Sequence, residues 1–111
     1  MNTFHSLGTI AFDGEPEFTV LIDWTYEEVP VSQIFDAEEM DIADIQARIE
    51  RYELTYFVLR ARAIYKDKKL GEQYLGCCLY ENPEDVLIDG TANDLAREAI
   101  HEAKEWLSIA L

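Results

Sequence analysis

The sequence predicts an α+β fold, a two-layer sandwich in which an antiparallel sheet of four to five strands carries two main helices on one face. Residues 54–65 form a long β-branched and aromatic run, two pairs of strand-like runs are joined by polar turns, and a stretch with helical periodicity follows each pair. The expected order is therefore ββαββα. A length of 111 residues fits one domain, so we expect residues 1–111 to fold together.

The first pair of strands is expected at residues 3–12 and 17–24, joined at the turn signal Asp13-Gly14. Alternation places Phe18, Val20, Ile22 and Trp24 on one face of the second strand, and Thr19, Leu21 and Asp23 on the other. Pro30 removes a ladder donor from the segment that follows, which we expect to be a loop with an edge strand around residues 31–35.

The first helix is expected at residues 38–52, because its apolar side chains recur every three or four residues. These residues are Ile42, Ile45, Ile49 and Tyr52. Acidic residues crowd the start of the helix, whereas Arg48 and Arg51 lie near its end. That polarity is the one a helix dipole favours.

The central strand at residues 54–65 is expected to pair with residues 73–80 across a polar, lysine-rich turn. Alternation places Thr55, Phe57, Leu59, Ala61, Ala63 and Tyr65 on one face, and Tyr56, Val58, Arg60, Arg62 and Ile64 on the other. If the helices cover the first face, the second is open. An open face of this kind is typical of an interface, so its five residues are candidates for a homodimer contact.

Asn82-Pro83 predicts the start of a short helix that Gly90 ends. The last helix is expected from a Thr91 cap to near Leu111. Its inward face contains Leu95, Ala99, Ala103, Trp106, Leu107 and Ala110. The small residues among them should allow this helix to lie close to the sheet.

The charge of the chain is strongly asymmetric. The net charge is −14, and residues 1–47 contain 11 acidic residues and no lysine or arginine. Residues 48–111 contain 12 acidic and 9 basic residues, so the two parts carry −11 and −3. A charge of this sign disfavours direct binding to nucleic acid and to anionic membranes.

No sequence pattern indicates catalysis, a cofactor or a metal. The Cys and His spacings do not match a zinc site, the glycines do not form a phosphate-binding loop, and the serines do not lie in a nucleophile elbow. Glu98 and His101 have a spacing found in di-iron bundles, but the further ligands that such a site needs are missing. We therefore expect a protein that is not an enzyme.

No apolar run is long enough to span a bilayer, and the N-terminus lacks the basic and apolar regions of a secretory signal. The expectation is a cytoplasmic protein with reduced thiols. Cys77 and Cys78 are neighbours on a strand, so they should point to opposite faces and not form a disulfide with each other.

The acidic part of the chain also contains apolar side chains of the kind that anchor interfaces. The candidate partner-binding residues are Tyr26, Glu27, Glu28, Phe35, Asp36, Glu38, Glu39, Asp41 and Asp44. A short acidic domain without catalytic motifs has the profile of anti-restriction and anti-CRISPR inhibitors, some of which mimic DNA, and of nuclease immunity proteins. The leading hypothesis is therefore an inhibitor that binds a basic, nucleic-acid-handling protein.

Three alternatives remain open at this point. The carboxylates could simply solvate a small protein and stabilise a helix. The chain could be a homodimeric structural or assembly module that uses the open sheet face. It could also bind a small ligand, or act as an enzyme, in a pocket between the sheet and the last helix near Trp106 or Trp24.

Overall fold

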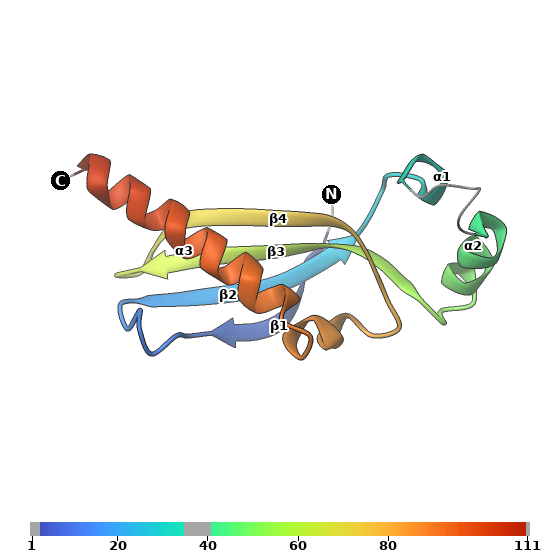
Figure 1. Ribbon diagram of the computed structural model, residues 1–111, viewed down its shortest axis with the longest axis horizontal. Coiled ribbons are helices and arrows are strands. Elements are labelled where there is room, and N and C mark those ends of the chain that lie inside the picture. The colour runs from blue at the N-terminus through green and yellow to red at the C-terminus, as the bar shows by residue number, and fades with distance from the viewer. Residues whose placement is uncertain (1–2, 35–40, 111) are drawn as a thin grey trace.

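A single antiparallel sheet forms the body of the molecule (Figure 1). The computed structural model describes residues 3–34 and 41–110. The elements are β1 (His5–Ile10), β2 (Phe18–Tyr26), α1 (Val31–Ile34), α2 (Ile42–Glu50), β3 (Thr55–Tyr65), β4 (Lys68–Tyr80), the 3₁₀ helix η1 (Pro83–Leu87) and α3 (Thr91–Ala110). The four strands of the described chain lie in the order β1-β2-β3-β4, which confirms the α+β prediction with an antiparallel sheet.

β3 is a central strand, as its sequence predicts. It pairs with β2 from Tyr26↔Phe57 to Phe18↔Tyr65, and with β4 on its other side. Because cross-strand partners share a face, this register puts the predicted inward residues of β2 and β3 on the same side of the sheet. Phe57, Leu59 and Val20 are fully buried there, in the main hydrophobic core.

α3 crosses that face and packs against β4, β3 and β2. The contact is close because small residues meet: a Cβ added to Gly71 of β4 would lie 2.0 Å from the carbonyl oxygen of Ala99. Ala99 and Ala103 are fully buried at this contact. The prediction that small residues let the last helix approach the sheet is confirmed.

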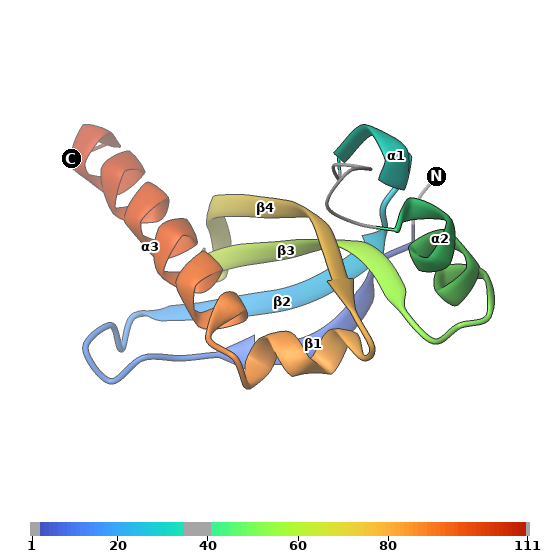
Figure 2. The ribbon, with the colours of Figure 1, turned by 45° about the vertical axis from the view of Figure 1, so that its right-hand side comes forward.

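The prediction of two helices on one face is wrong. α1 and α2 lie at the end of the sheet where β2 ends and β3 begins (Figures 1 and 2). Ile45 of α2 packs with Val31 and Tyr56 in a separate small core. Tyr56 alternates with the inward-facing Phe57, so this second core belongs to the face opposite α3.

Other boundaries also differ from the predictions. Val31–Ile34 is one helical turn instead of an edge strand, and α2 ends at Glu50. β4 begins at Lys68, five residues earlier than expected, because the β3–β4 turn contains only Lys66 and Asp67. Both of these residues have positive φ, at 48° and 66°, as a tight two-residue hairpin requires.

The molecule is elongated, with principal extents of 51 × 28 × 23 Å. Its radius of gyration is 16.0 Å, whereas a compact chain of this length has about 13 Å. α1 and α2 extend one end of the sheet, and the C-terminal turns of α3 extend the other (Figure 1). Surfaces at the two ends are therefore well separated.

Candidate binding surface on the insertion between β2 and β3

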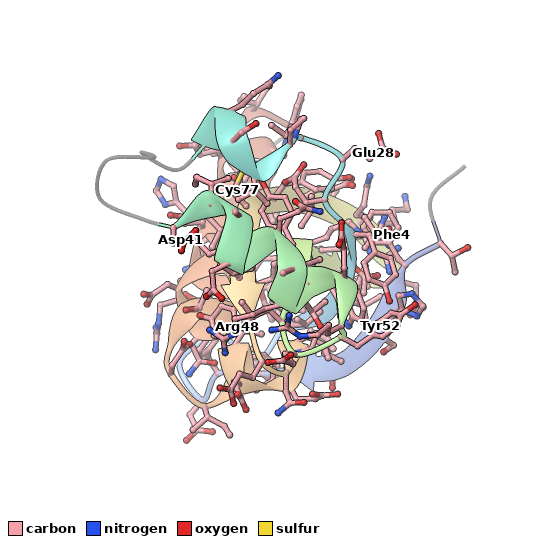
Figure 3. All side chains as sticks on the ribbon, turned by 90° about the vertical axis from the view of Figure 1, so that its right-hand side faces the viewer. Phe4, Glu28, Asp41, Arg48, Tyr52 and Cys77 are labelled. Atoms are coloured by element: carbon pink, nitrogen blue, oxygen red, sulfur yellow. The ribbon has the colours of Figure 1, made fainter. Side chains whose placement is uncertain are left out.

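Residues 27–54 connect β2 to β3 and contain both α1 and α2, and we call this segment the insertion. Its sequence has nine acidic residues and two arginines, so it carries −7 of the total charge of −14. The insertion occupies one end of the molecule, where Glu28, Asp41 and Tyr52 lie around its rim (Figure 3). Half of the net charge of the chain thus comes from this one segment.

Capping defines the start of α2. The Asp41 carboxylate accepts a hydrogen bond from the backbone N–H of Asp44 at 3.0 Å, as an N-cap does. Asp44 lies in the first turn and Arg48 in the last, which confirms the charge polarity expected from the sequence. Asp41 therefore caps the helix through its side chain, whereas the exposed Asp44 carboxylate acts on the helix only through its charge.

A Schellman motif ends α2. The backbone N–H of Glu53 bonds to the carbonyl of Arg48 at 2.8 Å, and the N–H of Tyr52 bonds to that of Ile49. Tyr52 occupies the left-handed position of the motif, with φ of 62°. This turn directs its side chain outward, where it is 91% exposed, although its spacing predicted a place on the buried helix face.

The half-buried Glu27 carboxylate is engaged by backbone groups of the protein. One carboxylate oxygen accepts the backbone N–H of Cys77 at 2.9 Å, and the other accepts those of Glu28 and Val29. Burial by itself would raise the pKa of this carboxyl, but the three backbone donors outweigh it and lower the pKa. Glu27 is thus a charged link between the insertion and β4.

The N–H of Cys77 needs this acceptor because β4 is irregular at this point. The β3–β4 register shifts between Phe57 and Leu59, and Cys77 has φ of 59°. A bulge of this kind removes a backbone group from the sheet ladder. Cys78 next to it is buried on the opposite face, and burial raises the pKa of its thiol to about 11. Both thiols are free.

A pocket of about 240 Å³ lies where the insertion meets the sheet, and we call it the junction pocket. It is lined by Tyr26, Glu27, Glu28, Val29, Pro30, Val31, Gln46, Ile49 and Tyr56. Tyr56 is only 7% exposed, and its hydroxyl is enclosed beside the Cys77 side chain. Burial, with the neighbouring Cys77 and Glu27, raises the pKa of this hydroxyl, so it is neutral.

The structure brings several of the predicted binding residues to this end of the molecule. Tyr26 is 59% exposed and, like Glu28, lines the junction pocket, while Asp41 and Asp44 are exposed on α2. Glu27 is the exception, because its carboxylate is engaged by backbone groups. The remaining predicted residues, Phe35, Asp36, Glu38 and Glu39, lie outside the described residues.

Sequence reasoning did not place Tyr52 on this surface or Tyr56 in the small core beneath it. Tyr52 was grouped with the helix core by its spacing, and its positive φ was not visible in the pattern. Tyr56 was placed on the open face of the sheet, but the insertion covers that end of the face. The sequence did contain one indication: both tyrosines lie within a few residues of the acidic first helix.

The remainder of the open face is held together by ion pairs within the chain. Arg60 binds both carboxylate oxygens of Asp23, at 2.8 and 2.6 Å, and Arg62 binds the same group at 2.9 Å. Phe4 lies over the Arg60 guanidinium, 3.6 Å from ring centroid to Cζ. Val58 and Ile64 are half-buried. The two arginines of the predicted dimer face thus have a counter-charge inside the monomer.

A second pocket, of about 400 Å³, lies between β4 and α3 beside Trp106. Its charged groups are already engaged: Lys69 pairs with Glu72, and Glu102 accepts a hydrogen bond from Gln73. Within the described residues, no three Cys, His, Asp or Glu side chains are grouped so that they could hold a metal ion. No helix in residues 3–34 and 41–110 is long and apolar enough to cross a membrane.

The chain matches no protein-family model, no curated protein and no solved structure. Its function is therefore argued from its own residues.

Proposed function

We propose that this protein is a non-catalytic acidic binding protein whose insertion binds a basic, nucleic-acid-handling partner and inhibits it. The observation that carries the proposal is the concentration of charge in one protruding unit. Seven of the nine basic residues in the sequence lie outside the insertion, which itself holds nine acidic residues. An anti-restriction, anti-CRISPR or nuclease-immunity role, with carboxylates standing in for phosphates, fits such a surface.

The insertion combines charge with apolar contact area. Tyr52 is almost fully exposed, and Val29 and Tyr26 expose apolar surface near the junction pocket. Carboxylates accelerate encounter with a basic surface, while buried aromatic side chains supply most of the binding energy once the complex forms. A purely solubilising surface does not need exposed tyrosine and valine side chains beside its charges.

The proposal is tested by capturing partners from the lysate of the native host at low and at high salt, and by comparing charge-reversal variants. Asp44→Lys/Glu50→Lys reverses two exposed charges of α2, and we expect it to weaken partner binding by at least about tenfold. One stoichiometric basic partner, released by salt and sensitive to this variant, would support the proposal.

α3 provides the matched control. Asp94 and Glu98 are exposed, and Asp94 lies in the first helical turn, as Asp44 does in α2. Asp94→Lys/Glu98→Lys changes the net charge of the protein by the same amount at a site outside the insertion. Equal losses of binding in the two variants would show that only overall charge matters, and the proposed binding surface would be wrong.

The homodimer hypothesis stays a prediction. Arg60 and Arg62 of the open sheet face bind Asp23, and Arg60 also contacts Phe4. This face therefore has fewer free charged groups for a second copy than the sequence indicated. A mass that rises with concentration in wild type, and that Val58→Asp keeps at the monomer value, would favour it over the acidic binding surface.

A further inference from the structure

The pocket of about 400 Å³ between β4 and α3 lies at the end of the molecule opposite the insertion, and we call it the terminal groove (Figure 1). Its apolar walls are formed by Leu70, Gly71, Trp106 and Leu107. Trp106 is 55% exposed, and Ile109, one helical turn further along α3, is 78% exposed. Single exposed apolar side chains are ordinary, but large ones gathered beside an apolar hollow mark an interface. This end of the molecule is therefore a candidate contact surface.

The terminal groove suits a protein surface better than an added strand or a small molecule. The backbone N–H of Glu72, on the free edge of β4, already donates to the Glu102 carboxylate at 3.3 Å. Glu102 also accepts a hydrogen bond from Gln73, so the edge is engaged where a fifth strand would pair. The groove is open beside Trp106, whereas sites for small molecules enclose most of the ligand. An occupant that fits brings its own side chains.

Charges of opposite sign flank the terminal groove. Three of the four lysines in the chain lie at the β3–β4 turn: Lys66, Lys68 and Lys69. Because α3 and β4 run in opposite directions, this turn lies toward the C-terminal end of α3 (Figure 1). Glu105 precedes Trp106 directly, and Glu102 lies one helical turn before it. The surface is thus basic on one side of Trp106 and acidic on the other.

A surface with this pattern is complementary to a second copy of itself. A two-fold axis near Trp106 brings the lysine-rich turn of each copy opposite the acidic side of α3 in the other. The same rotation places each Trp106 side chain over the groove of the other copy. It also directs the two insertions, each of which carries −7, away from each other. Charge and shape therefore both favour a symmetric contact.

We propose that two copies of the chain associate through the terminal groove, with Trp106 of each copy seated in the groove of the other and Lys68 opposite Glu105 across the contact. Both charged residues are exposed, and cross-strand pairing with Tyr65 puts Lys68 on the sheet face that carries α3. The open sheet face takes no part in this contact. The dimer presents two insertions, but the inference does not rest on the proposed function.

Sedimentation of the full chain over a range of concentrations tests the association. We expect the mass to rise from the monomer value of 12.8 kDa toward twice that value. Trp106→Gln and Ile109→Gln each remove an exposed apolar side chain, so each should weaken the dimer at least about tenfold while leaving the circular dichroism spectrum unchanged. Wild-type protein that keeps the monomer mass up to about 1 mM would overturn the proposal.

Charge variants test the orientation of the two copies. Glu105→Lys makes the protein less negative, so it would promote association if overall repulsion were decisive. We expect it instead to weaken the dimer about fivefold, because it places a lysine opposite Lys68, and Lys68→Glu should have a similar effect. The exchange Lys68→Glu/Glu105→Lys keeps the net charge and should restore the wild-type affinity. Losses that add in the double variant would overturn the pairing.

Val58→Asp separates this contact from one through the open sheet face, and it should leave the association unchanged. A dimer abolished by Val58→Asp, yet retained in Trp106→Gln and Ile109→Gln, would overturn the terminal groove as the contact. Partner capture at the insertion is an independent measurement. A dimer whose partner ignores Asp44→Lys/Glu50→Lys would reject the proposed binding surface alone, whereas a monomer that binds a partner through the insertion would reject this inference alone.

Discussion

The carboxylate of Glu27 and the backbone N–H of Cys77 form a 2.9 Å hydrogen bond between residues 50 positions apart in the sequence. This bond joins the start of the insertion to the bulge in β4, across the end of the sheet. It also explains why one acidic residue of the insertion is not available to a partner. The Glu27 carboxylate therefore helps to hold the insertion against the sheet, although from composition alone it is one surface charge among many.

Replacing Glu27 by alanine removes the acceptor of three backbone N–H groups. Because the acceptor is charged but partly solvated, we expect a loss of about 1–2 kcal/mol in the free energy of unfolding. Urea denaturation measures this. Glu28→Ala changes the neighbouring exposed carboxylate and should stay within about 0.5 kcal/mol of wild type. Equal effects at the two positions would contradict the proposed role of Glu27.

The same carboxylate makes stability depend on pH. Its pKa is lowered in the folded state from an ordinary value near 4.5, so the stabilisation is present above that value and is lost as pH falls through the lowered pKa. Glu53, Glu72 and Asp89 have lowered pKa values as well and contribute in the same direction. Glu27→Gln should therefore lose less stability than wild type between neutral and acidic pH. Parallel pH profiles of the two proteins would refute this.

Gly71→Ala tests the close contact between β4 and α3. The added Cβ would meet the backbone of Ala99, which cannot move without displacing the helix. We expect a loss of about 3 kcal/mol in the free energy of unfolding. Gly14→Ala is the control, because a Cβ there meets nothing within 4 Å. Thermal unfolding of the two variants measures the difference in stability. A Gly71→Ala protein as stable as wild type would mean that α3 can shift away from β4 without a loss of stability.

Asp23→Asn tests the ion pairs of the open sheet face. The Asp23 side chain is 8% exposed and is shared by Arg60 and Arg62, so its neutralisation removes the ion-pair partner of both arginines. Since both guanidinium groups keep some contact with water, the expected loss is about 2–3 kcal/mol. Asp13→Asn, at the exposed β1–β2 turn, should have no measurable effect in the same denaturation experiment. An equally small change at Asp23 would show that the ion pairs are dispensable.

Periodicity predicted the parts of the fold that depend on local pattern. The two faces of β2 and β3, the hairpins and the alanine-rich side of α3 all follow from residue spacing. The position of α2 did not, because an amphipathic helix of nine residues fits either face of a sheet and the choice depends on contacts with Tyr56 and Val31. Tyr52 shows the same limit, since its backbone conformation at the end of α2 outweighs its spacing.

The candidate site was predictable as a segment but not as a geometry. Net charge along the sequence indicated residues 1–47 as the acidic part, which overlaps the insertion but also includes β1 and β2. The hydrogen bond that joins Glu27 to Cys77 depends on a bulge in β4, about twenty residues beyond the insertion. Contacts between segments that are distant in sequence have no signature in either one alone.

The most direct measurement of the central claim is the affinity of the captured partner for Asp44→Lys/Glu50→Lys and for Asp94→Lys/Glu98→Lys, determined at low and at raised salt. We predict that reversal in the insertion weakens binding by at least about tenfold and flattens the salt dependence, while reversal on α3 leaves both close to wild type. Equal affinities and equal salt dependence in the two variants would contradict the claim that the insertion is the binding surface.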